Sequence, residues 1–210
     1  MKNGKIILVG GGGHALSLLE AIPDPTLVAG YLDLSPSRNM AIPYLGEDDN
    51  AHKYKDERAL FHIAFVYSGL PEMAARRKLI EYYDSLGVDY AAIIAPAATV
   101  THNSKVGEGA AILNGAIVNR AQIGRHAIIN SGAIIEHDCI VGENTFIGPG
   151  TVVGGATVIG SDCFIGLGTK LKNGIKIAPG TTIGMGAVVT NDIREAGIYH
   201  GFPLRKYNKR

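Results

Sequence analysis

The chain has 210 residues, of which 46% are apolar, so it is long enough for one large or two modest domains with hydrophobic cores. A net charge of +1 gives no reason to expect a nucleic acid or an acidic membrane surface as partner. The first apolar run, Ile6 to Val9, is too short for a signal peptide, and no segment approaches the ~20 apolar residues that cross a bilayer. We therefore expect a cytoplasmic protein.

Strands and helices alternate over residues 1–90. Lys5 to Val9 predicts a buried strand, and Leu16 to Ile22 predicts a helix that stops at Pro23. Further expected elements are strands over Val28–Leu32 and His62–Tyr67, and a helix from Pro71 to about Leu86 with Leu79, Tyr82, Tyr83 and Leu86 along one side. Tyr90–Ile94 then leads into the next part of the chain. This alternation predicts a small Rossmann-like α/β domain with a parallel sheet of about four strands.

A glycine-rich loop, residues 10–15, lies between the first strand and the first helix. Its pattern, Gly10-x-Gly12-x-x-Ala15, fits the dinucleotide fingerprint, and Asp33 lies near the expected ~20 residues further on. Glycines let the backbone approach a pyrophosphate, and His14 could contact a phosphate or a sugar. Only one mononucleotide-sized half is present, so a nucleotide diphosphate carrying another group fits better than NAD. The alternative is a tight glycine-rich turn without a ligand.

An aliphatic residue recurs at every sixth position from Ile94 to Val189. The series runs through Ile94, Val100, Val106, Ile112 and Val118, and after one five-residue step through Ile123, Ile129, Ile135, Val141, Ile147, Val153, Ile159, Ile165, Leu171, Ile177, Ile183 and Val189. A six-residue period is typical of a parallel β-helix, a prism with one inward aliphatic residue per flat face and hexad. Three hexads make one coil of about 18 residues, so residue n should lie beside residue n+18.

Two further columns follow the repeat. Glycine often comes directly after the aliphatic residue, as at Gly107, Gly124 and Gly142, and we attribute it to corners with unusual backbone angles. Small or β-branched residues come two positions before the aliphatic residue and should also point inward. Cys139 and Cys163 belong to this inward column but fall on different faces, so we expect neither a disulfide nor a metal pair.

The corner at Glu136-His137-Asp138 departs from the repeat. His137 should face outward, and one coil further on Gly155 lies beside it, which leaves room for a slender ligand along the prism. A histidine titrates near pH ~6.5 and can remove a proton from a nucleophile, most readily when a carboxylate holds its other nitrogen. The sequence leaves open whether Glu136 or Asp138 is that carboxylate. The alternative is an exposed histidine without a role.

The glycine loop, the short α/β segment and the hexad prism with an outward histidine together resemble the bacterial hexapeptide-repeat sugar acetyltransferases. This family includes sialic acid O-acetyltransferases of the NeuD type and PglD-like or perosamine N-acetyltransferases, which act on nucleotide-linked 4-amino-4,6-dideoxy sugars. The resemblance implies a left-handed β-helix, acetyl-CoA as co-substrate, no metal, and a homotrimer with active sites between neighbouring prisms.

The resemblance also implies roles for single residues. His137 matches the general base, Asp138 its acidic partner, and Asn130 a polar residue of the same site. The nucleotide-sugar loop and strand end correspond to Gly11, Gly12, Gly13, His14 and Asp33. The backbone along acetyl-CoA and the closing segment of the chain correspond to Gly155, Gly184, Gly186, Pro203 and Arg205.

We thus expect a nucleotide-sugar-binding domain over residues 1–90, a β-helix domain over residues 91–210, and direct acetyl transfer to an amino sugar. Three alternatives stay open. A sialic acid O-acetyltransferase would need a cation for the substrate carboxylate, such as Arg76 or Arg77, although a charge on a helix surface is usually solvated. A carbonic anhydrase of the γ type needs three histidine ligands, whereas only His126 and His137 lie mid-prism. A non-catalytic nucleotide-sugar-binding protein would keep the loop without needing the base.

Overall fold

The computed structural model describes residues 4–66, 72–201 and 205–206. Its N-terminal part holds a parallel sheet in the order β2-β1-β3-β4, which confirms the expected four strands. The strands are β1 (Ile6–Val9), β2 (Val28–Leu32), β3 (Leu60–Ile63) and β4 (Asp89–Tyr90); the helices are α1 (Gly13–Ala21), α2 (Ala51–Asp56) and α3 (Glu72–Leu86), with short 3-10 turns at Pro25–Leu27 and Asp48–Asn50.

Several of the expected boundaries were wrong. Helix α1 begins at Gly13, so His14 lies in its first turn and not in a loop. Strand β3 covers Leu60–Ile63 and lies earlier than expected, because only these residues pair with β1. Tyr67 and Pro71, the expected ends of a strand and a helix, lie outside the described residues. Helix α2 was missed, since its sequence, AHKYKD, lacks an apolar period.

Helix α3 buries most of the expected side: Tyr83 is fully buried and Leu79 and Leu86 pack against the same core, whereas Tyr82 is 36% exposed. Its most deeply buried side chains also include Met73, Arg76 and Ile80, which were not expected. The buried residues follow the i, i+3, i+4 spacing of a helix stripe. One of them is an arginine, and a stripe that includes a charged residue cannot be found by counting apolar ones.

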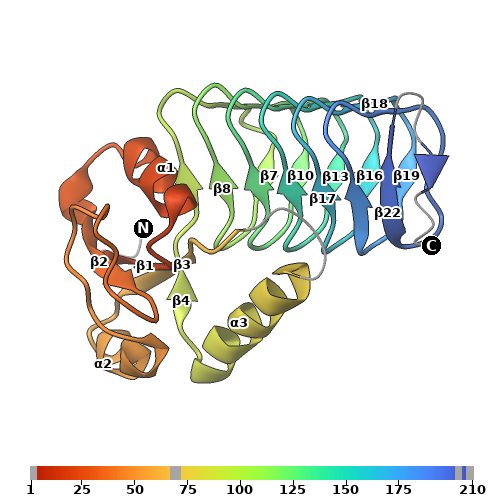
Figure 1. Cartoon of the computed structure of the whole chain (residues 1–210). Helices are drawn as coiled ribbons and strands as arrows, with labels where there is room; N and C mark the ends of the chain where they lie inside the picture. Colours follow the sequence, from red (N-terminus) through yellow and green to blue (C-terminus); the bar gives the residue numbers. More distant parts are fainter. Residues whose placement is uncertain (1–3, 67–71, 202–204, 207–210) are drawn as a thin grey trace.

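Most of the other described residues form a left-handed parallel β-helix of three sheets (Figure 1). Partners lie 18 residues apart, as predicted, and 17 apart where a coil includes the five-residue step. Its strands are β5 (Ile93–Ile94), β6 (Thr99–Val100), β7 (Lys105–Val106), β8 (Ala111–Ile112), β9 (Ile117–Val118), β10 (Gln122–Ile123), β11 (Ile128–Ile129), β12 (Ile134–Ile135), β13 (Ile140–Val141), β14 (Phe146–Ile147), β15 (Val152–Val153), β16 (Val158–Ile159), β17 (Phe164–Ile165), β18 (Lys170–Leu171), β19 (Lys176–Ile177), β20 (Thr181–Ile183), β21 (Val188–Val189), β22 (Gly197–His200) and β23 (Arg205–Lys206).

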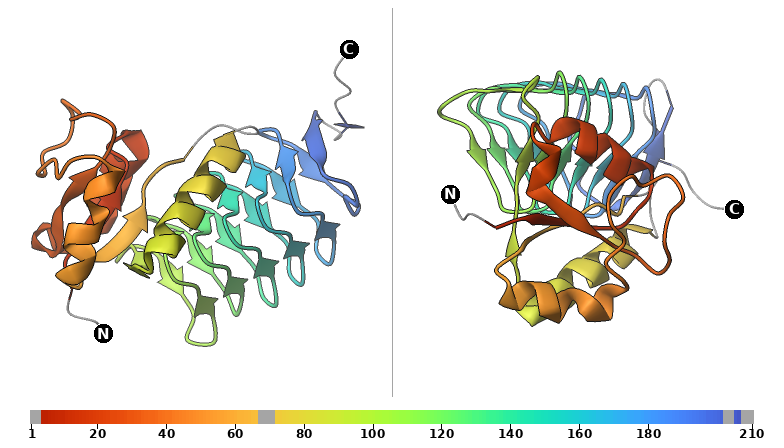
Figure 2. Two further views of the ribbon diagram at one scale, coloured as in Figure 1. Left: turned by 90° about the horizontal axis from the view of Figure 1, so that it is seen from below. Right: turned by 90° about the vertical axis from the view of Figure 1, so that its left-hand side faces the viewer.

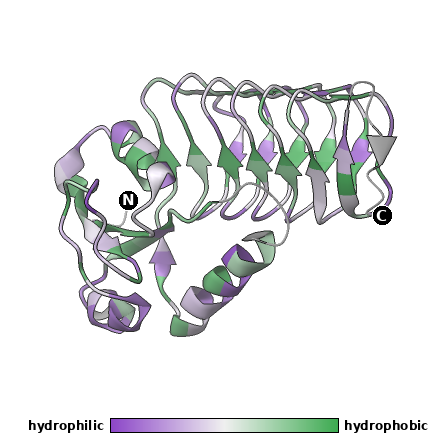
Figure 3. Ribbon diagram, in the orientation of Figure 1, coloured by the Kyte–Doolittle hydropathy of each residue, from purple (hydrophilic) through white to green (hydrophobic). Residues whose placement is uncertain are grey.

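The inward columns of the prism are those that the hexads predict. From Ile112 onward the aliphatic series forms one buried cluster; in the first coil Val100 and Val106 are partly buried against it and Ile94 is 42% exposed. Figure 3 shows apolar residues along the strands of the prism. The hydroxyls of the inward Thr145, Thr151, Thr157 and Thr169 donate to carbonyls 15 residues further on, as Thr145 does to Gly160 O at 2.7 Å. Cys139 and Cys163 are buried free thiols on different sheets, as expected.

The glycine that follows each aliphatic residue has a different cause from the one expected. These glycines do not take a positive φ; the residue two positions later does, for example Asn144 with φ 54°. They are needed because successive coils nearly touch: a Cβ on Gly142 would lie 2.4 Å from the carbonyl carbon of Gly160. Close backbone approach, not backbone freedom, therefore selects glycine there.

The small α/β part packs against the first coils of the prism (Figures 1 and 2). One apolar cluster joins Leu8 and Leu18 to Ala111, Leu113 and Ile128 on the outer surface of the prism. The expected division at residues 90 and 91 remains a prediction, and this cluster crosses it. No helix within the described ranges is long and apolar enough to cross a membrane.

Candidate active site

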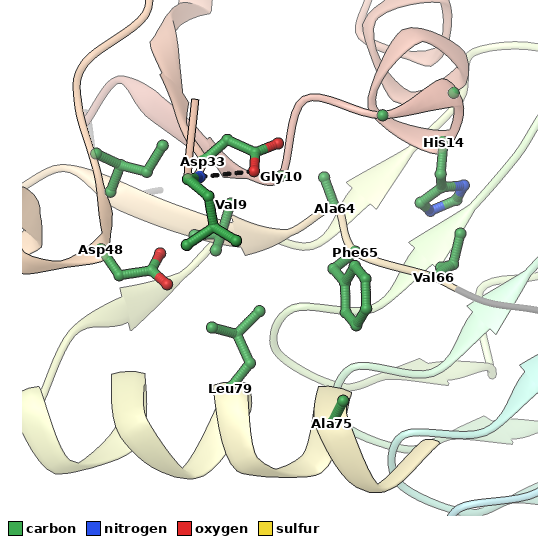
Figure 4. Close-up of a pocket in the computed structure, with 14 residues that line it drawn as sticks. Val9, Gly10, His14, Asp33, Asp48, Ala64, Phe65, Val66, Ala75 and Leu79 are labelled. Atoms are coloured by element: carbon green, nitrogen blue, oxygen red, sulfur yellow. Dashed lines mark hydrogen bonds between the residues drawn. The ribbon is translucent and has the colours of Figure 1, made fainter. Parts of the chain in front are cut away.

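A cavity of about 520 Å³ lies at the carboxyl ends of β1, β2 and β3 (Figure 4). Ligands of open parallel sheets bind at this edge, where loops leave the strands. Its wall includes the loop after β1, the residues after β2 and β3, and one side of α3. The lining residues are Val9, Gly10, Gly12, Gly13, His14, Leu32, Asp33, Leu34, Asp48, Ala64, Phe65, Val66, Ala75 and Leu79.

The four glycines of the loop serve different purposes. Gly10 has φ 109°, which side chains rarely adopt. Gly11 does not line the cavity: a Cβ there would lie 2.6 Å from the Tyr31 ring. Gly12 and Gly13 face open space, with no atom within 4 Å of an added Cβ. Of the three glycines expected to contact the nucleotide sugar, Gly12 and Gly13 therefore line the cavity and Gly11 does not.

Asp33 holds the loop in place. Its Oδ2 accepts the Gly11 N–H at 2.7 Å, and its Oδ1 accepts the Leu34 N–H at 2.7 Å. Carboxylate oxygens have further lone pairs, so the side chain can still accept from a ligand in the cavity that it lines. Its first contribution is to tie the glycine loop to the end of β2.

The N-terminus of α1 is open toward the cavity. Gly12 is the N-cap, no side chain of the described residues caps this end, and the first turn has no acidic residue. Its free N–H groups and positive dipole end suit a phosphate. His14 in this turn has a pKa lowered to about 3, chiefly by burial and then by the nearby His62 and Arg76, so it is neutral.

Sequence reasoning missed part of the cavity wall. Asp48, Phe65, Ala75 and Leu79 come from segments to which no ligand role was given. The one signal for Asp48 in the sequence is the acidic run from Glu47 to Asp49, which is more often a solvated surface.

His137 lies far along the chain from this cavity, at the corner between β12 and β13. Its side chain is 58% exposed, and its Nδ1 lies 2.9 Å from Asp138 Oδ2. Glu136 instead accepts a bond from Asn119 Nδ2 at 3.3 Å, so the carboxylate beside the imidazole is that of Asp138. The pKa of Asp138 is lowered, first by its hydrogen bond with His137 and also by Arg120, so it is ionised near neutral pH.

Gly155 lies next to His137, as the coil length predicts. A Cβ on Gly155 would lie 2.6 Å from His137 Nε2, so the imidazole occupies the space that a side chain would fill. The imidazole therefore lies along the next coil, with Nδ1 on Asp138 and Nε2 beside Gly155.

Two adjacent glycine substitutions should separate stability from function. Gly155→Ala is expected to displace the flexible His137 side chain and lower turnover by about 10–100-fold, with little change in melting temperature. Gly154→Ala puts a Cβ 2.6 Å from the backbone N of Asn173, which cannot yield, and should destabilise the fold by roughly 1–3 kcal/mol. Melting curves and initial rates for both variants check this. Equal loss of stability in the two variants would contradict it.

Other expected site residues lie on a different edge of the prism. Asn130 follows β11, and Gly184 and Gly186 follow β20. All three therefore lie at corners between the eight- and six-stranded sheets, and we call this edge of the prism the Asn130 ridge. His137 and Gly155 lie at corners between the six- and five-stranded sheets, and we call this edge the His137 ridge. One chain therefore does not bring the two groups together. Pro203 lies outside the described residues, and Arg205 is described only as part of β23.

The two arginines considered for a substrate carboxylate both hold α3 against the third edge of the prism. Arg76 is buried and donates to His126 O at 2.9 Å, to Ile63 O at 3.3 Å and to Asn144 Oδ1. Arg77 pairs with Asp162 at 2.7 Å and Glu143 at 3.0 Å. His126 is also buried, with its ring edge-on to Tyr90, on a different corner from His137. The expectation that these arginines are solvated was wrong for Arg76.

Comparison with known proteins agrees with this architecture. Residues 120–155 match the family described as bacterial transferase hexapeptide (six repeats). No curated protein matches the chain in sequence. Among solved structures, PerB from Caulobacter crescentus in complex with CoA and GDP-perosamine is 28% identical, with 98% of each chain covered and a TM-score of 0.88.

Two further structures share the fold over nearly the whole chain. The acetyltransferase domain of PglB from Neisseria gonorrhoeae, in complex with acetyl coenzyme A, is 26% identical, with 98% of this chain and all of that chain covered and a TM-score of 0.88. WeeI from Acinetobacter baumannii is 22% identical, with a TM-score of 0.82 over 97% of this chain and 99% of that one, and supports the fold alone. The chain thus has hexapeptide repeats and shares its architecture, over nearly its whole length, with solved bacterial sugar acetyltransferases, which supports an acyltransferase.

Proposed function

We propose that the protein transfers an acetyl group from acetyl-CoA to the amine of a nucleotide-linked 4-amino-4,6-dideoxy sugar. The observation that carries the proposal is the His137–Asp138 pair beside Gly155. It lies in a fold shared from end to end with PerB, which binds CoA and GDP-perosamine, and with the PglB domain, which binds acetyl coenzyme A.

The geometry of the pair suits a general base. With Nδ1–H donating to the ionised Asp138, Nε2 carries the free lone pair. His137 would take a proton from the sugar amine as its nitrogen bonds to the acetyl carbon, and the C–S bond then breaks. The same imidazolium can return the proton to the leaving thiolate, so the enzyme ends the cycle unchanged. No covalent enzyme intermediate is needed.

The cavity of the small domain suits the nucleotide end of this acceptor. Its open loop at Gly12 and Gly13 and the free end of α1 offer N–H donors to a diphosphate. With the nucleotide bound in this cavity, the sugar would extend outside it to the general base, His137. Positioning both substrates then supplies much of the rate.

A homotrimer would complete this site. Apolar side chains lie on the outer surface of the six-stranded sheet, between the Asn130 and His137 ridges; Ile117 there is 38% exposed, and Ile134 and Val152 are partly buried. Ile140, on the other side of the His137 ridge, is 41% exposed. A neighbouring copy that covers these residues would put a second wall beside His137, and the Asn130 ridge of another chain could supply it. Acetyl-CoA would lie between the two ridges.

The contacts of Arg76 and Arg77 bear on whether the acetyl group is transferred to an amine or to a hydroxyl. A sialic acid acceptor carries a carboxylate and would need a cation, but Arg76 and Arg77 are both engaged in holding α3. An amine acceptor with a nucleotide uses the cavity and the base as they stand. This supports N-acetylation.

Thiol release from acetyl-CoA, measured with a panel of acceptors, tests the proposal. The panel contains UDP- and GDP-linked 4-amino-4,6-dideoxy sugars, the same nucleotides linked to the 4-hydroxy sugars, and free and CMP-linked sialic acid. We expect turnover only with the amino sugars. Turnover confined to sialic acid would overturn the proposal in favour of O-acetylation, and no turnover with any acceptor would overturn the enzyme assignment to sugars of this class.

A further inference from the structure

The cavity of the small domain has polar groups along its length and an apolar space beside Asp48. The glycines before α1 form one end, and Asp48 forms the other, while Asp33 lies between them (Figure 4). Val9, Leu79 and other apolar side chains line the space beside Asp48. A diphosphate on α1 would place a ribose near Asp33 and a flat base in the apolar space against Asp48.

Asp48 is held rigidly by a buried tyrosine. The Tyr83 hydroxyl donates to Asp48 Oδ1 at 2.6 Å, and the Tyr83 side chain is fully buried. Burial, and then the hydrogen bond to Asp48, raise the pKa of Tyr83 well above its usual range, so the phenol stays a donor. Within the described residues no bond to Asp48 Oδ2 is found, and Figure 4 shows the carboxylate directed into the cavity.

We propose that the base bound here is guanine, with the Asp48 carboxylate accepting its N1–H and 2-amino N–H. This inference rests on the proposed function and adds the identity of the nucleotide, a guanosine diphosphate. A carboxylate is an acceptor only, and guanine offers two adjacent donors on one edge. Uracil and thymine offer one donor flanked by two carbonyls, which a carboxylate repels. Adenine and cytosine each present one amino donor beside a ring nitrogen that is an acceptor, as the carboxylate itself is.

Calorimetry with free nucleoside diphosphates tests the recognition of the nucleobase separately from catalysis. GDP should bind more tightly than UDP, dTDP, CDP and ADP by about 10–100-fold, the value of a hydrogen bond to a charged group. Inosine diphosphate keeps N1–H but lacks the 2-amino group and should lose about tenfold. Xanthosine diphosphate replaces that donor by a carbonyl and should bind more weakly still. UDP binding as tight as GDP, or no diphosphate binding, would overturn the proposal.

A matched pair of variants assigns the selectivity to one residue. Asp48→Asn should weaken GDP by at least about tenfold and leave UDP unchanged. Asp49→Asn, the adjacent acid that contacts the exposed Tyr82 at 3.4 Å and does not line the cavity, should change neither. If Asp48→Asn weakened the binding of all diphosphates equally, Asp48 would have a structural role and the proposed recognition of guanine would be overturned. Melting curves report any loss of fold.

These binding results are independent of turnover. Selective GDP binding by a protein that acetylates no amino sugar keeps the guanine assignment and removes the proposed function. Acetylation of UDP-linked amino sugars, with UDP bound as tightly as GDP, keeps the proposed function and removes the guanine assignment.

Discussion

His137→Ala is expected to lower kcat by about 10²–10⁴-fold, because it removes the only proton acceptor that we place at the amine. Affinity for acetyl-CoA and the melting temperature should change little, since the side chain is 58% exposed and packs only along the next coil. Steady-state rates, acetyl-CoA titration and melting curves provide the measurements.

The chain itself provides a matched control for this variant. His102 is exposed and occupies the corresponding corner position on the His137 ridge, in the first coil. His102→Ala should leave turnover unchanged. Asp138→Asn keeps the geometry but weakens the hold on Nδ1, and it should reduce kcat less than His137→Ala does. If His137→Ala retained wild-type turnover, or if His102→Ala lost it, the assignment of the base would be wrong.

Acid should destabilise the protein steeply below pH 6.5. Burial lowers the pKa of His14 and His126 to about 3 and that of His62 to about 4. Well above pH 6.5 all three are neutral in the folded and unfolded states, so stability is at its full value. As pH falls toward 4, the unfolded chain binds protons that the folded chain does not. Each histidine then removes about 1.4 kcal/mol per pH unit from the free energy of unfolding, and three remove up to about 4.

Urea unfolding at pH 7, 6, 5 and 4.5 measures this slope. His62→Gln, which retains a donor for Ala91 O, should reduce the slope by about 1.4 kcal/mol per pH unit. His52→Gln is the control, because His52 is exposed on α2. A slope unaffected by His62→Gln, or reduced equally by His52→Gln, would refute the role of the buried histidines. The carboxyls with lowered pKa, such as Asp84, titrate below this window.

Much of the prism could be predicted because its contacts are periodic. An aliphatic residue every six positions determines which side chains point inward, and the 18-residue coil determines which residues lie side by side. The coil length alone predicts that Gly155 lies beside His137, and the prediction is confirmed. The strand–helix alternation and the glycines of residues 10–13 likewise determine the parallel sheet and the open loop, since both are local in sequence.

Features that depend on contacts between distant, non-repeating segments were decided only by the tertiary structure. Asp138, not Glu136, meets the imidazole, because the backbone of each corner residue turns its side chain in a different direction. Arg76 is buried because α3 docks on the prism, and no pattern within the helix marks that surface. Asp48 faces the cavity because Tyr83, 35 residues later, holds its carboxylate. The sequence by itself determined the repeating frame and the position of His137 beside Gly155, whereas the docking of α3 and the loops decided what surrounds them.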